Sequence, residues 1–135
     1  MKGKTRIEKG IGEWKQVVKV WGMERWLNND KLYCMKELRL LKGWMCSLHY
    51  HKLKTETFYI VGGSVKMEVA LKGYGSVIDT FIMDPGDHIK ILPGKLHRFS
   101  GLEESIIMEC STKHFDSDSY REIESGKMES DNGKS

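Results

Sequence analysis

Short strand-like runs separated by turn residues are the feature that most restricts how this chain can fold. The runs lie at residues 16–21, 32–41, 45–50, 56–61, 64–71, 76–83, 88–92 and 104–112. Glycine, asparagine, aspartate and proline separate them, and no segment has a convincing helical period. This pattern predicts an all-β fold, built as an antiparallel sandwich or barrel.

The 135 residues suit a single domain. We expect residues 1–15 to form a polar N-terminal arm and residues 16–121 to form the barrel. Residues 122–135 hold only two apolar side chains, so we expect a largely disordered tail there.

Charge and composition exclude several classes of function. The net charge of +3 comes from basic residues scattered among acidic ones, which does not indicate a nucleic-acid partner. No run approaches the ~20 apolar residues of a membrane span, and the lysine-rich start lacks the apolar run of a secretory signal. Three cysteines without a close pair favour buried thiols in a reducing compartment, so we expect a cytoplasmic protein.

Two histidines one residue apart, His49 and His51, give the chain a metal-ligand spacing. Side chains two residues apart on a strand point to the same face, so both imidazoles can reach one ion. A short loop then returns the chain to Glu56, and His97 follows the turn at Pro93. Three imidazoles and one carboxylate predict a site for one divalent transition-metal ion (Mn, Fe, Co, Ni or Zn) with positions open to other ligands.

The segment around these histidines resembles the first motif of the cupin superfamily. It contains Gly43, five residues, the His-x-His pair, four residues, Glu56, six residues and Gly63, which is the complete family form. The resemblance implies a double-stranded β-helix, the jelly-roll barrel of cupins.

A second segment resembles the second cupin motif. Gly86, Gly94 and His97 fit the family form, whereas Leu92 stands where a proline is expected and Gly101 where asparagine is common. These departures affect turn geometry rather than metal ligands. The resemblance therefore implies a ligand set of three histidines and one glutamate.

Residues 18–121 are also similar to the small sugar-isomerase cupins and to the cupin domain of type II mannose-6-phosphate isomerases. The matching positions include Trp21, Gly22, Lys36, Glu109, Ser111, Thr112, His114, Phe115, Asp118 and Arg121. This resemblance implies a metal-dependent aldose–ketose isomerase that acts on a sugar or sugar phosphate through a metal-stabilised enediolate. It also implies a homodimer, because cupins often pair through edge strands.

Isomerisation requires a group that moves a proton between adjacent carbons, and Lys36 and Glu109 are the two candidates. Alternation places Lys36 on the apolar, core-facing side of its strand with Leu38. The same reasoning places Met108 and Cys110 on the apolar face of their strand and turns Glu109 away from it. The choice between the two candidates stays open at this stage.

Three further residues are candidates for binding a small-molecule substrate. Ser47 shares a strand face with His49, and Phe58 shares one with Glu56. Arg121 has the geometry to hold a phosphate, or to pair with a nearby aspartate. We expect His88 to be exposed and not to bind metal.

Two other functions use the same metal ligands. An Fe(II) dioxygenase would require an apolar pocket wall, whereas a sugar site requires charged and hydroxyl groups. A non-catalytic sugar- or metal-binding module would keep the ligands and lack a working base. Lys36, Ser47 and Arg121 favour the polar site.

Overall fold

The computed structural model describes residues 2–6, 11–70 and 78–129, which form strands and one short 3-10 helix. The strands are β1 (Lys2–Arg6), β2 (Ile11–Lys19), β3 (Gly22–Asn29), β4 (Cys34–Leu40), β5 (Trp44–Met45), β6 (Leu48–Tyr50), β7 (Glu56–Gly62), β8 (Val65–Val69), β9 (Asp79–Met83), β10 (His88–Ile91), β11 (His97–Gly101), β12 (Ser105–Ser111), β13 (Tyr120–Ile123) and β14 (Gly126–Lys127). The helix η1 spans Asp116–Asp118. Within these residues no helix is long and apolar enough to cross a membrane.

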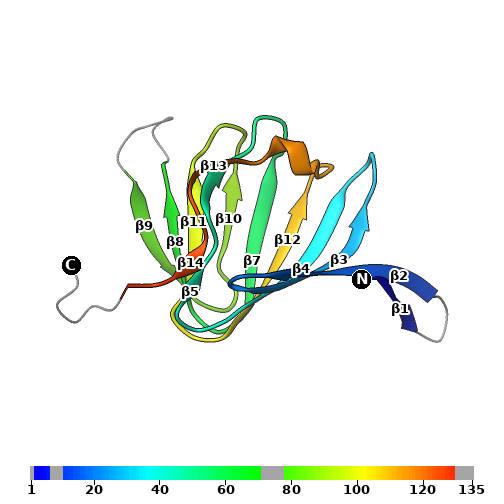
Figure 1. Ribbon diagram of the computed structural model, residues 1–135, viewed down its shortest axis with the longest axis horizontal. Coiled ribbons are helices and arrows are strands. Elements are labelled where there is room, and N and C mark those ends of the chain that lie inside the picture. Colours follow the sequence, from blue (N-terminus) through cyan, green and yellow to red (C-terminus); the bar gives the residue numbers. More distant parts are fainter. Residues whose placement is uncertain (1, 7–10, 71–77, 130–135) are drawn as a thin grey trace.

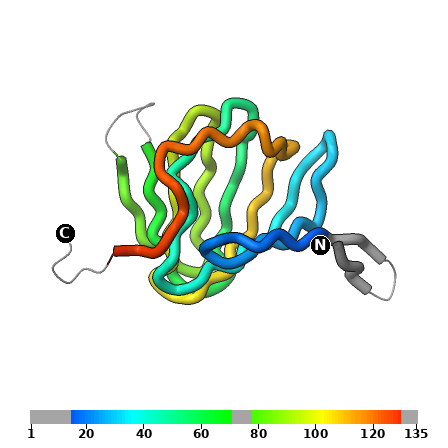
Figure 2. Tube along the Cα trace, in the orientation of Figure 1, coloured from blue at the N-terminus to red at the C-terminus, as the bar shows by residue number. Residues whose placement is uncertain are grey.

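The strands form two antiparallel sheets that enclose one barrel (Figure 1). The first sheet has the order β1-β2-β3-β4-β12-β7-β10. The second has the order β13-β6-β11-β5-β14, with β8 pairing with β11 and β9. The expected all-β jelly-roll barrel is therefore confirmed. Figure 2 shows how the C-terminal segment, in orange and red, returns across the second sheet.

Inward-facing side chains divide the barrel into an apolar part and a polar part. The apolar core contains Trp21, Leu38, Leu40, Cys46, Phe58, Ile60, Val65, Met67, Val69, Met83, Ile91, Phe99 and Ile107. Further along the inner faces of β4, β7 and β12, the buried residues are Lys36, Glu56 and Glu109. Buried charges cost free energy unless they are paired or bind a ligand, so this end is the place to look for a site.

Two glycines of the cupin-like motifs have backbone conformations that L side chains rarely adopt. Gly63 has φ of +89°, and a Cβ there would collide with Ser105 and with the Glu104 carbonyl. Gly94 has φ of +85°, and its amide donates a 2.7 Å hydrogen bond to the carbonyl of His51. This bond joins the turn before His97 to the loop that follows the histidine pair.

The two ends of the chain are more ordered than their composition suggested. β1 and β2 pair as a hairpin within the expected arm, and β2 continues the first sheet. In the expected tail, β13 extends to Ile123 beside β6 and β14 pairs with β5. The Met128 amide also donates to the Gly43 carbonyl at 2.7 Å. Main-chain pairing orders this segment despite its few apolar side chains; residues 130–135 lie outside the described residues.

Candidate metal centre

Three histidines meet where β6 and β11 lie side by side. His49 lies on β6 and His51 follows that strand, whereas His97 begins β11 and pairs with His49 across the ladder. Their rings are close, with centroids 4.4 Å apart for His49 and His97 and 4.9 Å apart for His49 and His51. One ligand nitrogen from each ring lies within 4.8 Å of the other two, so the group is able to hold one metal ion.

A carboxylate from the first sheet contacts two of these histidines. Glu56 begins β7, and its Oε2 lies 3.0 Å from His97 Nε2 and 3.4 Å from His51 Nε2. Glu56 and His97 are fully buried, and His51 is nearly so. The four residues that the sequence singled out therefore lie together, although they come from three strands and one loop.

Backbone carbonyls determine which nitrogen each histidine presents to the cluster. Nδ1 of His49 lies 2.8 Å from the Ser47 carbonyl, that of His51 2.8 Å from the Asp118 carbonyl, and that of His97 2.9 Å from the Lys95 carbonyl. A carbonyl only accepts, so each Nδ1 carries the proton and each neutral ring has its lone pair on Nε2. This arrangement is typical of histidines that bind metal.

The facing atoms of Glu56 and His97 test whether a metal fits. Both Glu56 Oε2 and His97 Nε2 are buried and have no hydrogen-bond partner among the described residues. Two lone pairs 3.0 Å apart would repel each other, so either a proton on His97 Nε2 or a metal ion must lie between these atoms. The donor set of imidazole nitrogens and one carboxylate oxygen fits a divalent transition metal.

Burial favours the neutral, metal-binding form of His49 and His51. It lowers the pKa of His49 well below the ordinary 6.5, and nearby His97 lowers it further. Burial also lowers the pKa of His51, although the charge of Glu56 opposes the shift. Burial alone would raise the pKa of Glu56, but His97 and the positive charge of Lys54 hold it well below its usual range. Neutral imidazoles and an ionised carboxylate are the forms required for metal binding.

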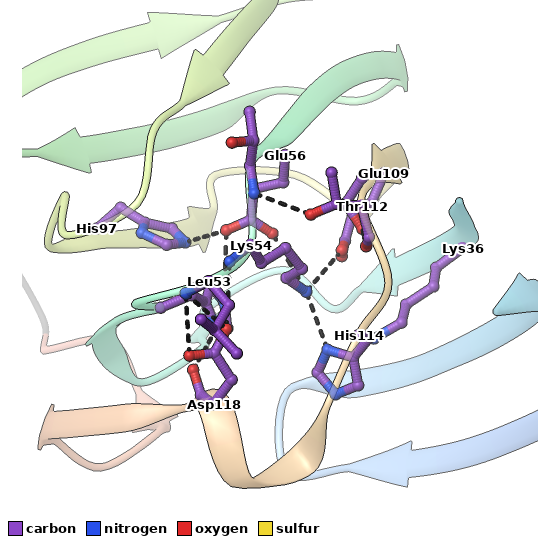
Figure 3. A network of polar contacts seen from close by, with 12 residues as sticks. Lys36, Leu53, Lys54, Glu56, His97, Glu109, Thr112, His114 and Asp118 are labelled. Carbon is purple, nitrogen blue, oxygen red and sulfur yellow. Dashed lines mark hydrogen bonds and ion pairs between the residues drawn. The ribbon is translucent and has the colours of Figure 1, made fainter. Parts of the chain in front are cut away.

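Lys54 links the three-histidine cluster and Glu56 to a second group of polar residues (Figure 3). Its Nζ donates to Glu109 Oε2 at 2.9 Å and lies 3.5 Å from Glu56 Oε1. The same nitrogen lies 3.0 Å from Nδ1 of His114, whose Nε2 contacts Asp116 at 3.0 Å. Burial alone would lower the pKa of Lys54, but Glu109 and Glu56 together raise it, so the lysine is charged and bridges the two carboxylates.

The predicted orientation of Glu109 is wrong. Glu109 is buried on the inner face of β12 together with Ile107, whereas Cys110 is exposed. The apolar residues Ile106 and Met108 lie on the outer face of the sheet, where Met108 pairs with Tyr59 of β7. The more apolar face of β12 therefore points outward, because its inner face contributes polar groups to the site.

The other predicted site residues also lie around the cluster. Lys36 is buried on the inner face of β4, as expected, and is paired with Glu109 in the ladder. Ser47 Oγ lies 3.2 Å from His49 Nδ1. The ring centroids of Phe58 and His97 lie 5.9 Å apart. Arg121 is exposed on β13 and lies opposite His49 of β6 in the ladder. His88 is exposed on β10, as predicted.

Sequence reasoning missed the buried residue Lys54, and it named Asp118 only as a matching position without a role in the site. The Asp118 carboxylate accepts hydrogen bonds from the amides of residues 52–54 at 2.8–3.2 Å, and its carbonyl accepts from His51. Asp118 thus holds the loop between His51 and Glu56. The position of Lys54 in the sequence could have revealed its role. It lies two residues before Glu56, and on extended backbone residues two apart point to the same face.

His49, His51, Lys54, Glu56 and Glu109 line a cavity of about 700 Å³. Its apolar lining includes Trp21, Leu38, Phe58 and Phe99, and its charged lining is formed by Lys15, Lys19, Glu24, Lys36, Lys54, Glu56, Glu109, Asp116 and Arg121. Clefts of roughly 300–1,000 Å³ are typical of small-molecule sites.

Solved structures of other proteins share this fold. The capsular polysaccharide assembling protein CapF from Staphylococcus aureus is 16% identical with a TM-score of 0.67, and the match covers 80% of this chain and 32% of CapF. KdgF from Halomonas sp. is 17% identical with a TM-score of 0.65, covering 77% of this chain and 90% of KdgF. A Bacillus subtilis oxalate decarboxylase studied for its Mn(II) centres is 19% identical with a TM-score of 0.68, and the match covers 81% of this chain and 30% of that protein.

These structures identify the fold as the cupin β-barrel, which is the fold that the motif resemblance implied. The chain spans about a third of CapF and of the oxalate decarboxylase. No protein-family model matches the chain, and no curated protein does. Fold and site together define a cupin-fold protein with a three-histidine group able to hold a metal ion.

Replacing Lys54 by methionine should destabilise the metal-free protein by about 3–5 kcal/mol, because the substitution leaves buried carboxylates without their cation. The free energy of unfolding in urea measures the change. Lys42→Met is the matched control, since Lys42 forms an exposed ion pair with Glu103 and should contribute less than about 1 kcal/mol. Adding Glu109→Gln to Lys54→Met should recover part of the loss. Equal effects of the two lysine substitutions would contradict the buried bridge.

Metal affinity should change little between pH 7.5 and 6.5 and decrease in more acidic solution. Protons compete with the metal for imidazole nitrogens, and the pKa values of His49 and His51 lie below the ordinary 6.5. Competition therefore begins at lower pH than it would for exposed histidines. Calorimetric titration with Zn²⁺ or Mn²⁺ at several pH values measures this, and a steep loss already between pH 7.5 and 6.5 would refute the prediction.

Proposed function

We propose that His49, His51, Glu56 and His97 bind one divalent transition-metal ion, and that the protein uses it to interconvert an aldose and its ketose. The observation that carries this proposal is a group of three imidazoles with defined tautomers, two of which face a buried carboxylate oxygen, beside a cavity. When bound, such an ion polarises a carbonyl and stabilises the negative charge that develops during isomerisation.

Glu109 is the group that we assign to proton transfer. It lines the cavity, and Lys54 positions its carboxylate through a 2.9 Å hydrogen bond. Burial raises its pKa above the usual value of a glutamate, against the opposing charge of Lys54, which makes the carboxylate a better proton acceptor. Lys36, the other candidate, presents an ammonium group that donates but does not accept a proton.

The lining of the cavity favours a sugar over the substrate of an Fe(II) dioxygenase. Charged groups from β2, β3, β4 and β12 and the Ser47 hydroxyl line the cavity. Its apolar lining includes Trp21 and Phe99. Hydroxyl-rich ligands require such polar partners, and aromatic side chains suit the apolar faces of sugar rings. The likenesses to a polysaccharide assembling protein and to a protein with Mn(II) centres fit this assignment.

Metal analysis of the purified protein, followed by a panel of aldoses, ketoses and their phosphates in deuterated water, tests the proposal. We expect about one divalent ion per chain and conversion of at least one sugar, with deuterium incorporated at C2 where the transferred proton exchanges. Dioxygen consumption by the Fe(II) form without sugar conversion would replace the isomerase by the dioxygenase. Metal binding without either activity would leave a sugar- or metal-binding module.

A further inference from the structure

The two buried lysines of the cavity differ in how many close polar neighbours their ammonium groups have. Lys54 Nζ has close polar neighbours in Glu109, Glu56 and His114. Lys36 has a side chain only 3% exposed, yet its nearest described carboxylate oxygen, on Glu24, lies 3.6 Å away. Its other close neighbour is the Trp26 ring, whose centroid lies 4.0 Å from Nζ. An ammonium group has three donors, so Lys36 keeps donors that these neighbours do not use.

Glu24 and Trp26 hold Lys36 in place without saturating it. The Trp26 Nε1–H donates a 2.7 Å hydrogen bond to Glu24 Oε1, and Lys19 Nζ lies 3.9 Å from Oε2. Burial alone would raise the pKa of Glu24, but Lys36 and Lys19 bring it below its usual value, so the carboxylate is charged. The tryptophan ring and the carboxylate thus fix a buried cation at the cavity wall (Figure 3 shows the extended Lys36 side chain).

The charge of the cavity favours an anionic ligand. Five basic side chains and four carboxylates line it. A divalent ion at the three histidines and Glu56 would add two more positive charges to this excess. Lys15 adds positive charge near Lys36, with its Nζ 4.6 Å from the same Trp26 ring. Low-dielectric walls strengthen the attraction of such a cavity for negative groups.

We propose that Lys36, held by Glu24 and Trp26, binds a negatively charged group of the substrate, a carboxylate or a phosphate, at a subsite on the cavity wall formed by β3 and β4. The substrate is then a sugar acid or a sugar phosphate rather than a neutral sugar. That the substrate is a sugar rests on the proposed function, whereas the anion subsite rests on the geometry and charge around Lys36.

Calorimetric binding of three probes to the metal-loaded full chain tests this subsite. Glucose, glucuronate and glucose 6-phosphate share a ring and differ in charge. We expect at least one anionic probe to bind about ten- to a hundredfold more tightly than glucose, as a charge-assisted hydrogen bond implies. Preference for glucuronate indicates a carboxylate ligand, and preference for glucose 6-phosphate a phosphate ligand.

Lys36→Met should abolish this preference, with unchanged metal content and unchanged glucose affinity. Lys36→Arg should retain part of it, which separates loss of charge from loss of fold, and thermal melting checks folding of both variants. Lys90→Met, at an exposed position of β10, is the control and should bind all probes as the unaltered protein does. Rising salt should weaken the anionic probes more than glucose.

Absence of the anion preference, or its independence from Lys36, overturns the inference. Similar affinity for all three probes, or no binding of either anion at millimolar concentration, excludes an anion subsite. Equal weakening of every probe in Lys36→Met shows that Lys36 only supports the cavity. Because binding is the readout, an anion preference without sugar conversion contradicts the isomerase and leaves the subsite intact. Conversion of neutral sugars without an anion preference supports the isomerase and excludes the subsite.

Discussion

A protein with alanine in place of His97 should fail to retain a divalent ion, losing at least about a hundredfold in affinity. Alterations of groups that only orient a ligand typically cost 10–100-fold, and His97 is a direct candidate ligand. Its Nε2 is fully buried and faces Glu56 Oε2 at 3.0 Å. Metal content after gel filtration and calorimetric titration both measure the loss, and His49→Ala, His51→Ala and Glu56→Ala should behave alike.

His88→Ala and His114→Ala are the controls for this result. His88 is exposed on β10, and both ring nitrogens of His114 contact Lys54 and Asp116, although its ring packs edge-on against that of His51 at 6.4 Å. Both variants should keep their metal. Retention of metal by His51→Ala together with its loss in His88→Ala would show that the ligand assignment is wrong. Unfolding curves of the metal-free proteins separate loss of a ligand from loss of the fold.

Glu109→Gln should keep its metal and lose turnover by about 10²–10⁴-fold, the usual contribution of a general base. Glutamine can still accept the hydrogen bond from Lys54 through its amide oxygen, so the cavity should keep its shape. It cannot take up the substrate proton. Initial rates on the converted sugar, with metal content measured on the same sample, give the comparison.

Glu104→Gln provides the matched control, because Glu104 is an exposed glutamate just before β12. It should leave turnover within error of the unaltered protein. Full activity of Glu109→Gln would remove Glu109 from the proton transfer. Loss of metal in that variant would instead indicate that the glutamate supports the ligands.

The proximity of the candidate metal ligands was predictable because short-range geometry determines most of their arrangement. Strand periodicity puts His49 and His51 near one another, and a four-residue loop returns the chain to Glu56. The position of His97 depends on long-range pairing, because the strand ladder places it opposite His49. Only the motif resemblance indicated that His97 would join the other ligands. The orientation of each imidazole depends on carbonyls such as that of Asp118, 67 residues from His51, which no local pattern reveals.

The face of β12 was mispredicted because hydrophobic alternation assumes that the inside of a barrel is apolar. That assumption holds for Ile107 and fails for Glu109, which belongs to the polar part of the interior. Lys54 was missed for a related reason: a lysine in a short loop is normally exposed. Only the carboxylates of Glu56 and Glu109, brought together by β7 and β12, make its burial favourable.

The hydrogen bonds from the His51 ring and the following loop to Asp118 bear on the order of events during synthesis of the protein. Until residue 118 has left the ribosome, the loop after His51 lacks its carboxylate partner and the imidazole lacks the carbonyl that fixes its tautomer. His97 and Glu109 also follow His51 in the chain, by 46 and 58 residues. A nascent chain that presents only His49 and His51 would offer an ion two flexible ligands, so high-affinity binding at the proposed metal site would wait until the barrel closes.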